Sequence, residues 1–160
     1  MATITKLGLQ NPANQLGSTP YGNVTAFRYI LKTVASGAVE GGDSTAAVAS
    51  GDTVKIGLLP AGFRLIDSEI VVKTGLTATI TAKVGFAYAD GVDSTAVPQD
   101  DDFFGTGITV ATAGRYRNAT SNTSVTLPKE AWLTLTTAVA ANAKASELEI
   151  IVFAINEGVV

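Results

Sequence analysis

The sequence has 160 residues, with 11 basic and 14 acidic side chains, a formal net charge of −3, and no cysteine or histidine. A chain of this length forms one domain with a sizeable core, and the missing residue types exclude disulfides, thiolate metal sites and histidine-dependent catalysis. The sequence pI of about 4.8 argues against nucleic acid as a partner. We expect no membrane insertion, because no apolar run approaches about 18 residues, and no secretion signal is visible at the N-terminus.

The chain is more apolar than a small soluble monomer needs. Hydrophobic residues make up 46% of the sequence and charged residues 16%, and the mean hydropathy is +0.30. Charged residues usually account for about a quarter of a soluble domain. We therefore expect surface that is buried against copies of the chain or against another protein.

Residues 1–23 show neither helical nor strand periodicity and contain Pro12, Gly17 and Pro20. They are predicted to form an extended arm ahead of a single domain at 24–160. The arm is either a frayed terminus or a segment that lies on a neighbouring subunit. In the second case its anchors are predicted to be apolar or aromatic side chains, namely Leu7, Leu9, Leu16 and Tyr21.

The domain begins with a predicted strand at 23–34, followed by a loop of small residues at 35–50 that we expect to add nothing to the core. Three further strands are predicted at 52–59, 63–73 and 77–89. The turn Pro60-Ala61-Gly62 predicts a hairpin-like pair between the first two of these. Polar residues fall on both faces of 63–73, which indicates a bulge near Asp67 or a strand covered on both faces.

The rest of the chain continues the same pattern of short strands and turns. We expect an acidic loop at 90–107, a strand at 108–112, the basic group Arg115-Tyr116-Arg117 and a polar loop at 118–124. Strands are predicted at 131–139 and 147–156, with one helical turn or a loop between them. Without any long helical period, the sequence predicts an all-β antiparallel sandwich or barrel of jelly-roll-like type, preceded by the arm.

The acidic residues supply the only candidates for metal binding or acid catalysis. Oxygen ligands of this kind suit a hard cation such as calcium, but their spacing does not match an EF-hand loop. A solvated acidic loop is the usual setting for a run of like charges. A glycosidase-like carboxylate pair is the third interpretation. The residues concerned are Asp90, Asp93, Asp100, Asp101 and Asp102.

Aromatic and arginine residues supply the candidates for protein contacts. Arg115 and Arg117 on either side of Tyr116 form an anchor on an acidic partner, or else two solvated arginines beside an inward tyrosine. Adjacent aromatics in a strand point to opposite faces, so we expect one ring of Phe103-Phe104 in the core and the ring of Phe104 at a partner. Trp132 is expected in a second core layer or at an interface.

Several of these motifs together resemble small structural proteins of tailed bacteriophages. The matching segments are GDTVKIGLLPAGFRLIDSEIVVKT, ITAKVGFAYADG and the late strand ELEIIVFAIN. The pattern is similar to that of capsid decoration, or head cement, proteins. The resemblance implies a β-sandwich or barrel that assembles, often as a homotrimer, on the capsid exterior of a virion put together in the host cytoplasm. Its implied partner is the major capsid protein, which terminal arms would grip.

The sequence thus predicts a non-enzymatic virion protein without cofactor or metal, which bridges major capsid protein subunits and stabilises the shell. A phage tail or head-fibre component is one alternative. A carbohydrate-binding jelly-roll module is another, and it requires exposed aromatics in a groove. A hydrolase requires a carboxylate pair, for which Asp93, Asp100 and Asp101 are the candidates.

Overall fold

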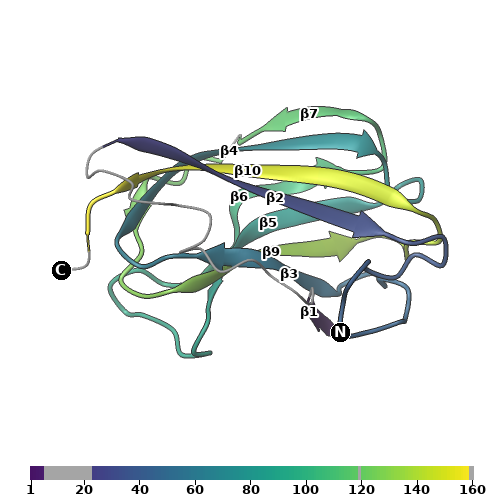
Figure 1. Cartoon of the computed structure of the whole chain (residues 1–160), viewed down its shortest axis with the longest axis horizontal. Helices are drawn as coiled ribbons and strands as arrows, with labels where there is room; N and C mark the ends of the chain where they lie inside the picture. The colour runs from purple at the N-terminus through teal and green to yellow at the C-terminus, as the bar shows by residue number, and fades with distance from the viewer. Residues whose placement is uncertain (6–22, 119, 159–160) are drawn as a thin grey trace.

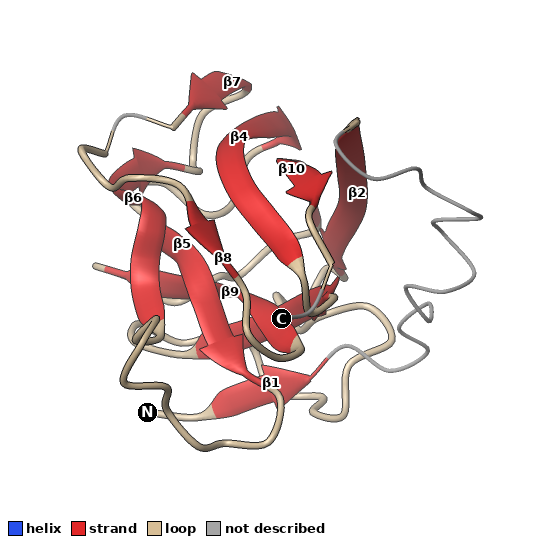
Figure 2. Cartoon of the chain, turned by 90° about the vertical axis from the view of Figure 1, so that its left-hand side faces the viewer, coloured by secondary structure: helices blue, strands red, loops and turns tan. Residues whose placement is uncertain are grey.

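The computed structural model describes residues 1–5, 23–118 and 120–158, which form two β-sheets packed face to face (Figure 1). Sheet I has the order β1-β3-β9-β5-β6 and sheet II the order β2-β10-β4-β7. In Figure 2 the strands of sheet II extend from β7 at the top to β2 at the right, and β6, β5 and β1 of sheet I lie below them and to the left. Of the two architectures expected, the structure has the all-β sandwich, and no helix capable of crossing a membrane occurs in the described part of the chain.

The strands are antiparallel except for the parallel pair β1 and β3. Sheet I consists of β1 (Thr3–Thr5), β3 (Thr53–Leu59), β9 (Ala131–Ala138), β5 (Thr81–Tyr88) and β6 (Asp100–Thr109). Sheet II consists of β2 (Val24–Thr33), β10 (Ser146–Asn156), β4 (Phe63–Thr74) and β7 (Gly114–Arg117), and the short β8 (Val125–Thr126) also pairs with β4.

The core lies between the two sheets and is built by the inward residues of each strand. Alternation along β10 buries every second side chain, as the period-two pattern of a strand with one covered face requires. Phe27 of β2 and Phe63 of β4 meet edge to face with ring centroids 5.0 Å apart. Each fully buried aliphatic or aromatic side chain contributes roughly 1.5–3 kcal/mol, so this interface holds the sandwich together.

The hairpin predicted across Pro60-Ala61-Gly62 is wrong. β3 lies in sheet I and β4 in sheet II, so the turn carries the chain from one sheet to the other. Gly62 takes a φ of 78° there, and its N–H donates to the carbonyl of Leu127 at 2.8 Å. A turn whose residues are typical of a β-hairpin therefore connects a strand of sheet I to a strand of sheet II.

The irregularity predicted near Asp67 is confirmed as a bulge. Phe153 pairs with Asp67 and Ala154 with Leu65, which leaves Ile66 without a partner in the register of β4 and β10. The extra residue reverses the inward face of β4, so that Leu65 and Ser68 both point into the protein. The mixed polarity of this strand follows from that reversal.

The acidic segment and the adjacent aromatics differ from expectation. β6 begins at Asp100, whereas the sequence predicted a loop up to residue 107. It can cover β5 because Gly85 has no side chain, and a Cβ there would lie 2.0 Å from the carbonyl oxygen of Asp100. The pairing of β5 with β6 is irregular, and both Phe103 and Phe104 are buried, with ring centroids 5.0 Å apart.

The loops at one end of the sandwich are tied together by buried Asn142. Its amide donates to Thr33 Oγ1 at 3.0 Å and to the carbonyl of Gly37 at 3.3 Å. Its carbonyl oxygen accepts from the backbone N–H of Thr77 at 3.0 Å. The segment at 139–145 is a loop without a helical turn. The 35–50 loop was expected to stay out of the core, but it buries three apolar side chains, Ala38, Val39 and Val48.

We expect Asn142→Ala to destabilise the protein by about 3 kcal/mol, because several buried polar groups lose their partners at once. For a domain of this size that corresponds to a fall in Tm of roughly 6–12 °C. Thermal unfolding followed by circular dichroism measures it, with the exposed Asn23→Ala as control. Equal Tm values for the two variants would contradict the role of Asn142.

Candidate interaction surfaces

The predicted anchors Leu7, Leu9, Leu16 and Tyr21 lie outside the described residues. The first residues of the predicted arm are part of the sandwich, since Thr3–Thr5 form β1 and Ile4 is buried. The N–H of Ala2 also donates to Asp52 at 2.8 Å. The boundary at residue 23 between arm and domain stays a prediction.

The basic group of the sequence forms β7 at the edge of sheet II. Arg115 contacts Glu69 at 2.7 Å, and Arg117 contacts Asp67 at 2.6 Å. Both guanidinium groups lie on the outer face of the sheet. Tyr116 points the other way, packs against the core and donates its hydroxyl to the carbonyl of Thr112 at 3.1 Å. The spacing of Arg115 and Arg117 matches that of Asp67 and Glu69, but only the pairing of β4 with β7 brings the two sets of side chains together.

The other two aromatic candidates have different positions. The ring of Phe104 is in the core, because the irregular start of β6 turns it inward together with Phe103. It is therefore not exposed to a partner. Trp132 lies half-buried on the outer face of sheet I, where Lys55 Nζ is 5.5 Å from the centre of its ring.

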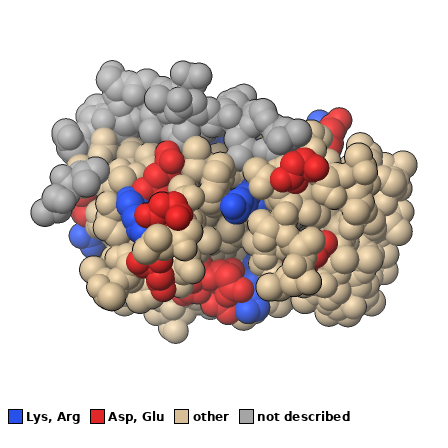
Figure 3. Space-filling view, turned by 90° about the horizontal axis from the view of Figure 1, so that it is seen from below, with Lys and Arg blue, Asp and Glu red and all other residues tan. Residues whose placement is uncertain are grey.

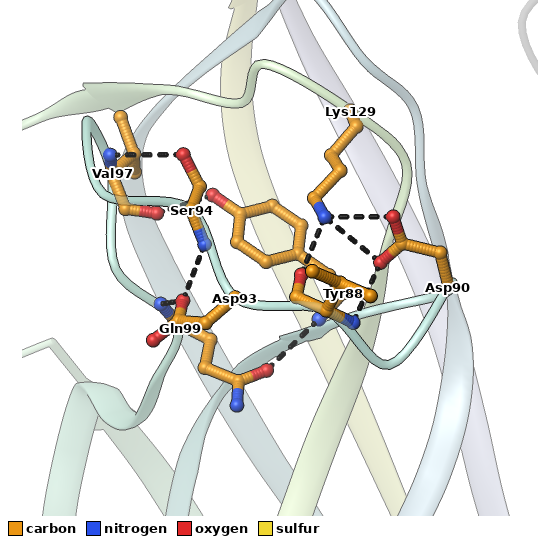
Figure 4. A network of polar contacts seen from close by, with 8 residues as sticks. Tyr88, Asp90, Asp93, Ser94, Val97, Gln99 and Lys129 are labelled. Atoms are coloured by element: carbon orange, nitrogen blue, oxygen red, sulfur yellow. Dashed lines mark hydrogen bonds and ion pairs between the residues drawn. The ribbon is translucent and has the colours of Figure 1, made fainter.

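The loop between β5 and β6 is held by its own polar side chains and by Lys129, which precedes β9 (Figure 4). Lys129 donates to Asp90 at 2.7 Å and lies over the ring of Tyr88, 4.6 Å from its centre. Asp93 accepts from the backbone N–H groups of Ser94 and Gln99, each at 2.7 Å. The hydrogen bond from Lys129 holds the pKa of Asp90 below its usual range, and the N–H of Val92 adds to this. These two carboxylates thus have structural partners.

The three consecutive aspartates at the start of β6 bring their carboxylate oxygens within 4.8 Å of one another. Oxygens so placed can accept a hard cation, but Lys83 already lies beside them, 3.4 Å from Asp101 and 3.9 Å from Asp102. A hydrogen bond between Asp102 and Asp100 raises the pKa of Asp102. The group is a compact anionic cluster with one lysine counterion.

On sheet II the ion pairs place the cation outside and the carboxylate beneath. The basic side chains are 42–69% exposed and their acidic partners 13–34%. The arrangement holds in every ion pair between described residues on this sheet. Its basic members are Arg28, Lys32, Arg64, Lys73, Arg115 and Arg117.

On sheet I and its loops the order is reversed. Asp90 is 52% exposed against 30% for Lys129, and Asp101 is 58% exposed against 41% for Lys83. Seen from below, on the side where β1 and β3 lie in Figure 1, acidic groups outnumber basic ones, and the right-hand part of this face is nearly uncharged (Figure 3). In the ion pairs of the described residues, the more exposed group is thus basic on sheet II and acidic on sheet I and its loops.

The described surface also has shallow hollows. One of about 400 Å³ lies between β6 and the segment after β7, and one of about 340 Å³ lies beside it, towards the β5–β6 loop. Asn122 lines both and donates to Asp100 at 3.3 Å and to the carbonyl of Phe103 at 3.1 Å. Neither hollow brings Asp93 together with Asp101, the arrangement that a catalytic carboxylate pair would need.

No model of a protein family and no curated protein sequence matches the chain. Solved structures do. A chain in the capsid of Ralstonia phage GP4 superposes with a TM-score of 0.64 at 20% identity, over 99% of this chain and 100% of that one. The fold is one that phage capsids contain. A chain of the cyanophage Pam1 capsid asymmetric unit gives a TM-score of 0.60 at 18% identity, over 87% and 89% of the two chains. The resemblance to phage structural proteins is thus confirmed at the level of the fold.

The ion pairs of sheet II predict acid sensitivity. Hydrogen bonds from Lys73, Arg28 and Arg64 lower the pKa values of Glu147, Glu149 and Glu157, respectively. The stability that these groups contribute is complete above the unfolded pKa of about 4.3 and is lost as the pH falls through the lower folded values. We expect Glu149→Gln to make the decline below about pH 4 shallower, measured by urea unfolding at a series of pH values. An unchanged pH dependence would contradict this.

The anionic cluster predicts the opposite effect. Because the fold raises the pKa of Asp102, its charged form is disfavoured in the native state, and stability is regained as the pH falls through that raised value. Asp102→Asn should therefore raise Tm at neutral pH, and its advantage over the wild type should shrink in acid. The control is Asp101→Asn, whose side chain contacts Lys83 at 3.4 Å. A lower Tm for Asp102→Asn at neutral pH would exclude repulsion within the cluster.

Proposed function

We propose that this protein is a structural virion component that binds the outside of a phage capsid and stabilises it by bridging major capsid protein subunits. The observation that carries the proposal is the match of fold over the whole chain to a chain of the phage GP4 capsid. The motifs that resemble head cement proteins support the decoration role. The proposal includes self-association, as a homotrimer, and excludes an enzymatic role, nucleic acid and membrane as parts of the function.

The contacts of the acidic residues support a structural role over hydrolysis. Asp93 is bound to two backbone N–H groups of its own loop, and Asp101 is paired with Lys83. A general acid or base has to reach substrate from an open site. The carboxylate of Asp93 therefore stabilises the β5–β6 loop, and that of Asp101 links β6 to β5.

The carbohydrate-binding alternative had five aromatic candidates, Tyr21, Phe103, Phe104, Tyr116 and Trp132, and the structure removes three of them. Phe103 and Phe104 are in the core, and Tyr116 packs its ring inward. A sugar-binding groove needs aromatic faces that are open to the ligand. The co-sedimentation experiment described below distinguishes a location on the capsid from one on the tail or head fibres.

The mechanism that we propose is multivalent attachment. A symmetric oligomer that touches several capsid subunits turns weak single contacts into firm binding, because each later contact is intramolecular. Binding to the assembled shell and not to dissociated subunits then stabilises the shell by mass action. The predicted anchors of the arm would supply one set of contacts and the sandwich the other.

The arm's role is tested with side-chain substitutions and not with a truncation, because a truncation would remove buried Ile4. In the test variant all four predicted anchors, Leu7, Leu9, Leu16 and Tyr21, are changed to Ser. We expect a folded protein whose co-sedimentation with empty shells falls at least about tenfold, as loss of one arm of a multivalent contact requires.

The matched control carries the same number of serine substitutions at exposed positions of the domain, Val24, Val34, Val92 and Val139. Undiminished co-sedimentation of the test variant would refute the arm's role. Failure of the wild type to bind shells, together with binding to purified tails or fibres, would move the protein to another part of the virion.

A further inference from the structure

The outer face of sheet II has an apolar centre. Alternate residues of β10 are buried in the core, and Ile151 and Phe153, which lie between them, point to the outside. The bulge of β4 adds Ile66, which is 40% exposed and has no partner in the register with β10. It lies between the residues of β4 that pair with Phe153 and Ala154. We call Ile66, Ile151 and Phe153 the apolar patch.

No described element covers the apolar patch. The described elements are all strands, and the two sheets that they form face each other through the core (Figure 1). Residues 150–155 are nevertheless continuously apolar, a pattern that is typical of a strand covered on both faces. Because the core covers only the inner face of β10, the pattern predicts a partner on the outer face. Apolar groups that remain at the surface in this way mark sites of protein contact.

Arginine side chains form a rim around the apolar patch. Arg28 lies opposite Ile151 in the pairing of β2 with β10, and Arg64 is the outward residue of β4 that precedes Ile66. The two arginine side chains are 54% and 42% exposed, while the carboxylates that they bind are 13% and 34% exposed. Each guanidinium group therefore retains N–H donors for a partner. Arg117 also lines the hollow between β6 and the segment after β7, so we leave it out of the rim.

We propose that the apolar patch and the rim formed by Arg28 and Arg64 are the surface with which this protein contacts the capsid shell. The shell surface that binds there is apolar at its centre and acidic at its rim. An apolar core with a polar rim, and with arginine enriched, is the usual composition of a protein interface. The inference rests on the proposed function, which supplies the shell as the partner, and it adds which face of the sandwich is used.

The charges nearest to solvent determine which partner fits. A two-fold contact would join the same face of two copies and so bring two arginine rims together, which is repulsive. A nucleic acid would neutralise the arginines but leave Ile66 and Phe153 uncovered, because its phosphate backbone has no apolar surface. A protein surface with carboxylates around an apolar centre meets both requirements, since carboxylates bind guanidinium groups through charge-assisted hydrogen bonds.

Removal of the apolar centre tests the contact. Ile66→Thr with Ile151→Thr keeps a β-branched residue at both strand positions but makes the patch more polar. We expect a folded protein whose co-sedimentation with empty shells falls at least about tenfold, because residues at the centre of an interface carry most of its binding energy. The matched control, Val92→Thr with Val139→Thr, makes the same kind of change at two exposed loop positions and should bind as the wild type does.

Removal of the rim tests the charge of the partner. Arg28→Gln with Arg64→Gln should weaken co-sedimentation about threefold or more at low salt. The difference from the wild type should vanish in roughly 0.5 M NaCl, where exposed charges are screened. The control is Lys55→Gln with Lys144→Gln, which removes the same charge from sheet I and from the loop before β10. Stronger binding of the arginine variant would indicate a basic shell surface and would overturn the proposal.

Circular dichroism and sedimentation velocity of each variant separate the remaining outcomes, and Ile66→Thr alone replaces the double variant if that does not fold. Wild-type shell binding by a folded patch variant overturns the inference and leaves the proposed function standing. A wild type that binds no shells overturns both. Dissociation of the oligomer in the patch variant assigns the patch to a second copy, and a lower Tm with unchanged shell binding assigns it to a segment of the chain itself. Either result overturns the proposal.

Discussion

The structure depends on the apolar contact between the inner faces of its two sheets. Along β10 alternate side chains point into that contact, and Leu148, Ile150 and Val152 are fully buried in the middle of sheet II. With no disulfide available, this burial has to offset the conformational entropy of the chain. Successive strands β3, β4 and β5 alternate between the sheets, so neither sheet forms without the other. The ion pairs and the hydrogen bonds of Asn142 add stability to a fold that the packing of the two sheets already determines.

The alternation of apolar residues predicted most strands, but not their partners. Strand existence is local information, whereas the turn at Pro60-Ala61-Gly62 has the same residues whether it closes a hairpin or crosses between sheets. The acidic residues before Phe103 predicted a loop, because nothing local reveals that Gly85 leaves room for the backbone of Asp100. The bulge at Ile66 was predictable, since it shifts the inward face of β4 in a way that the sequence itself displays.

The candidate surface was harder to predict than the fold. The sequence singled out Arg115, Tyr116 and Arg117, and the structure places the arginines outward and the tyrosine inward. Which partner in an ion pair is the more exposed depends on the neighbouring strands and on side-chain length, because the longer arginine reaches over the shorter carboxylate. Pairing of Asp67 and Glu69 with these arginines requires β4 and β7 to be adjacent, which the sequence does not state.

The layered charges of sheet II also change how the protein meets any charged material. The net charge determines the electrostatic potential far from the protein. A charged surface in contact with the protein interacts mainly with the outermost side chains within a Debye length. Although it carries more acidic than basic side chains, the molecule has one face that an anionic matrix attracts and one that a cationic matrix attracts. It should therefore adsorb to both kinds of ion exchanger at neutral pH, in opposite orientations, so a column chosen from the isoelectric point alone gives a misleading picture of its surface.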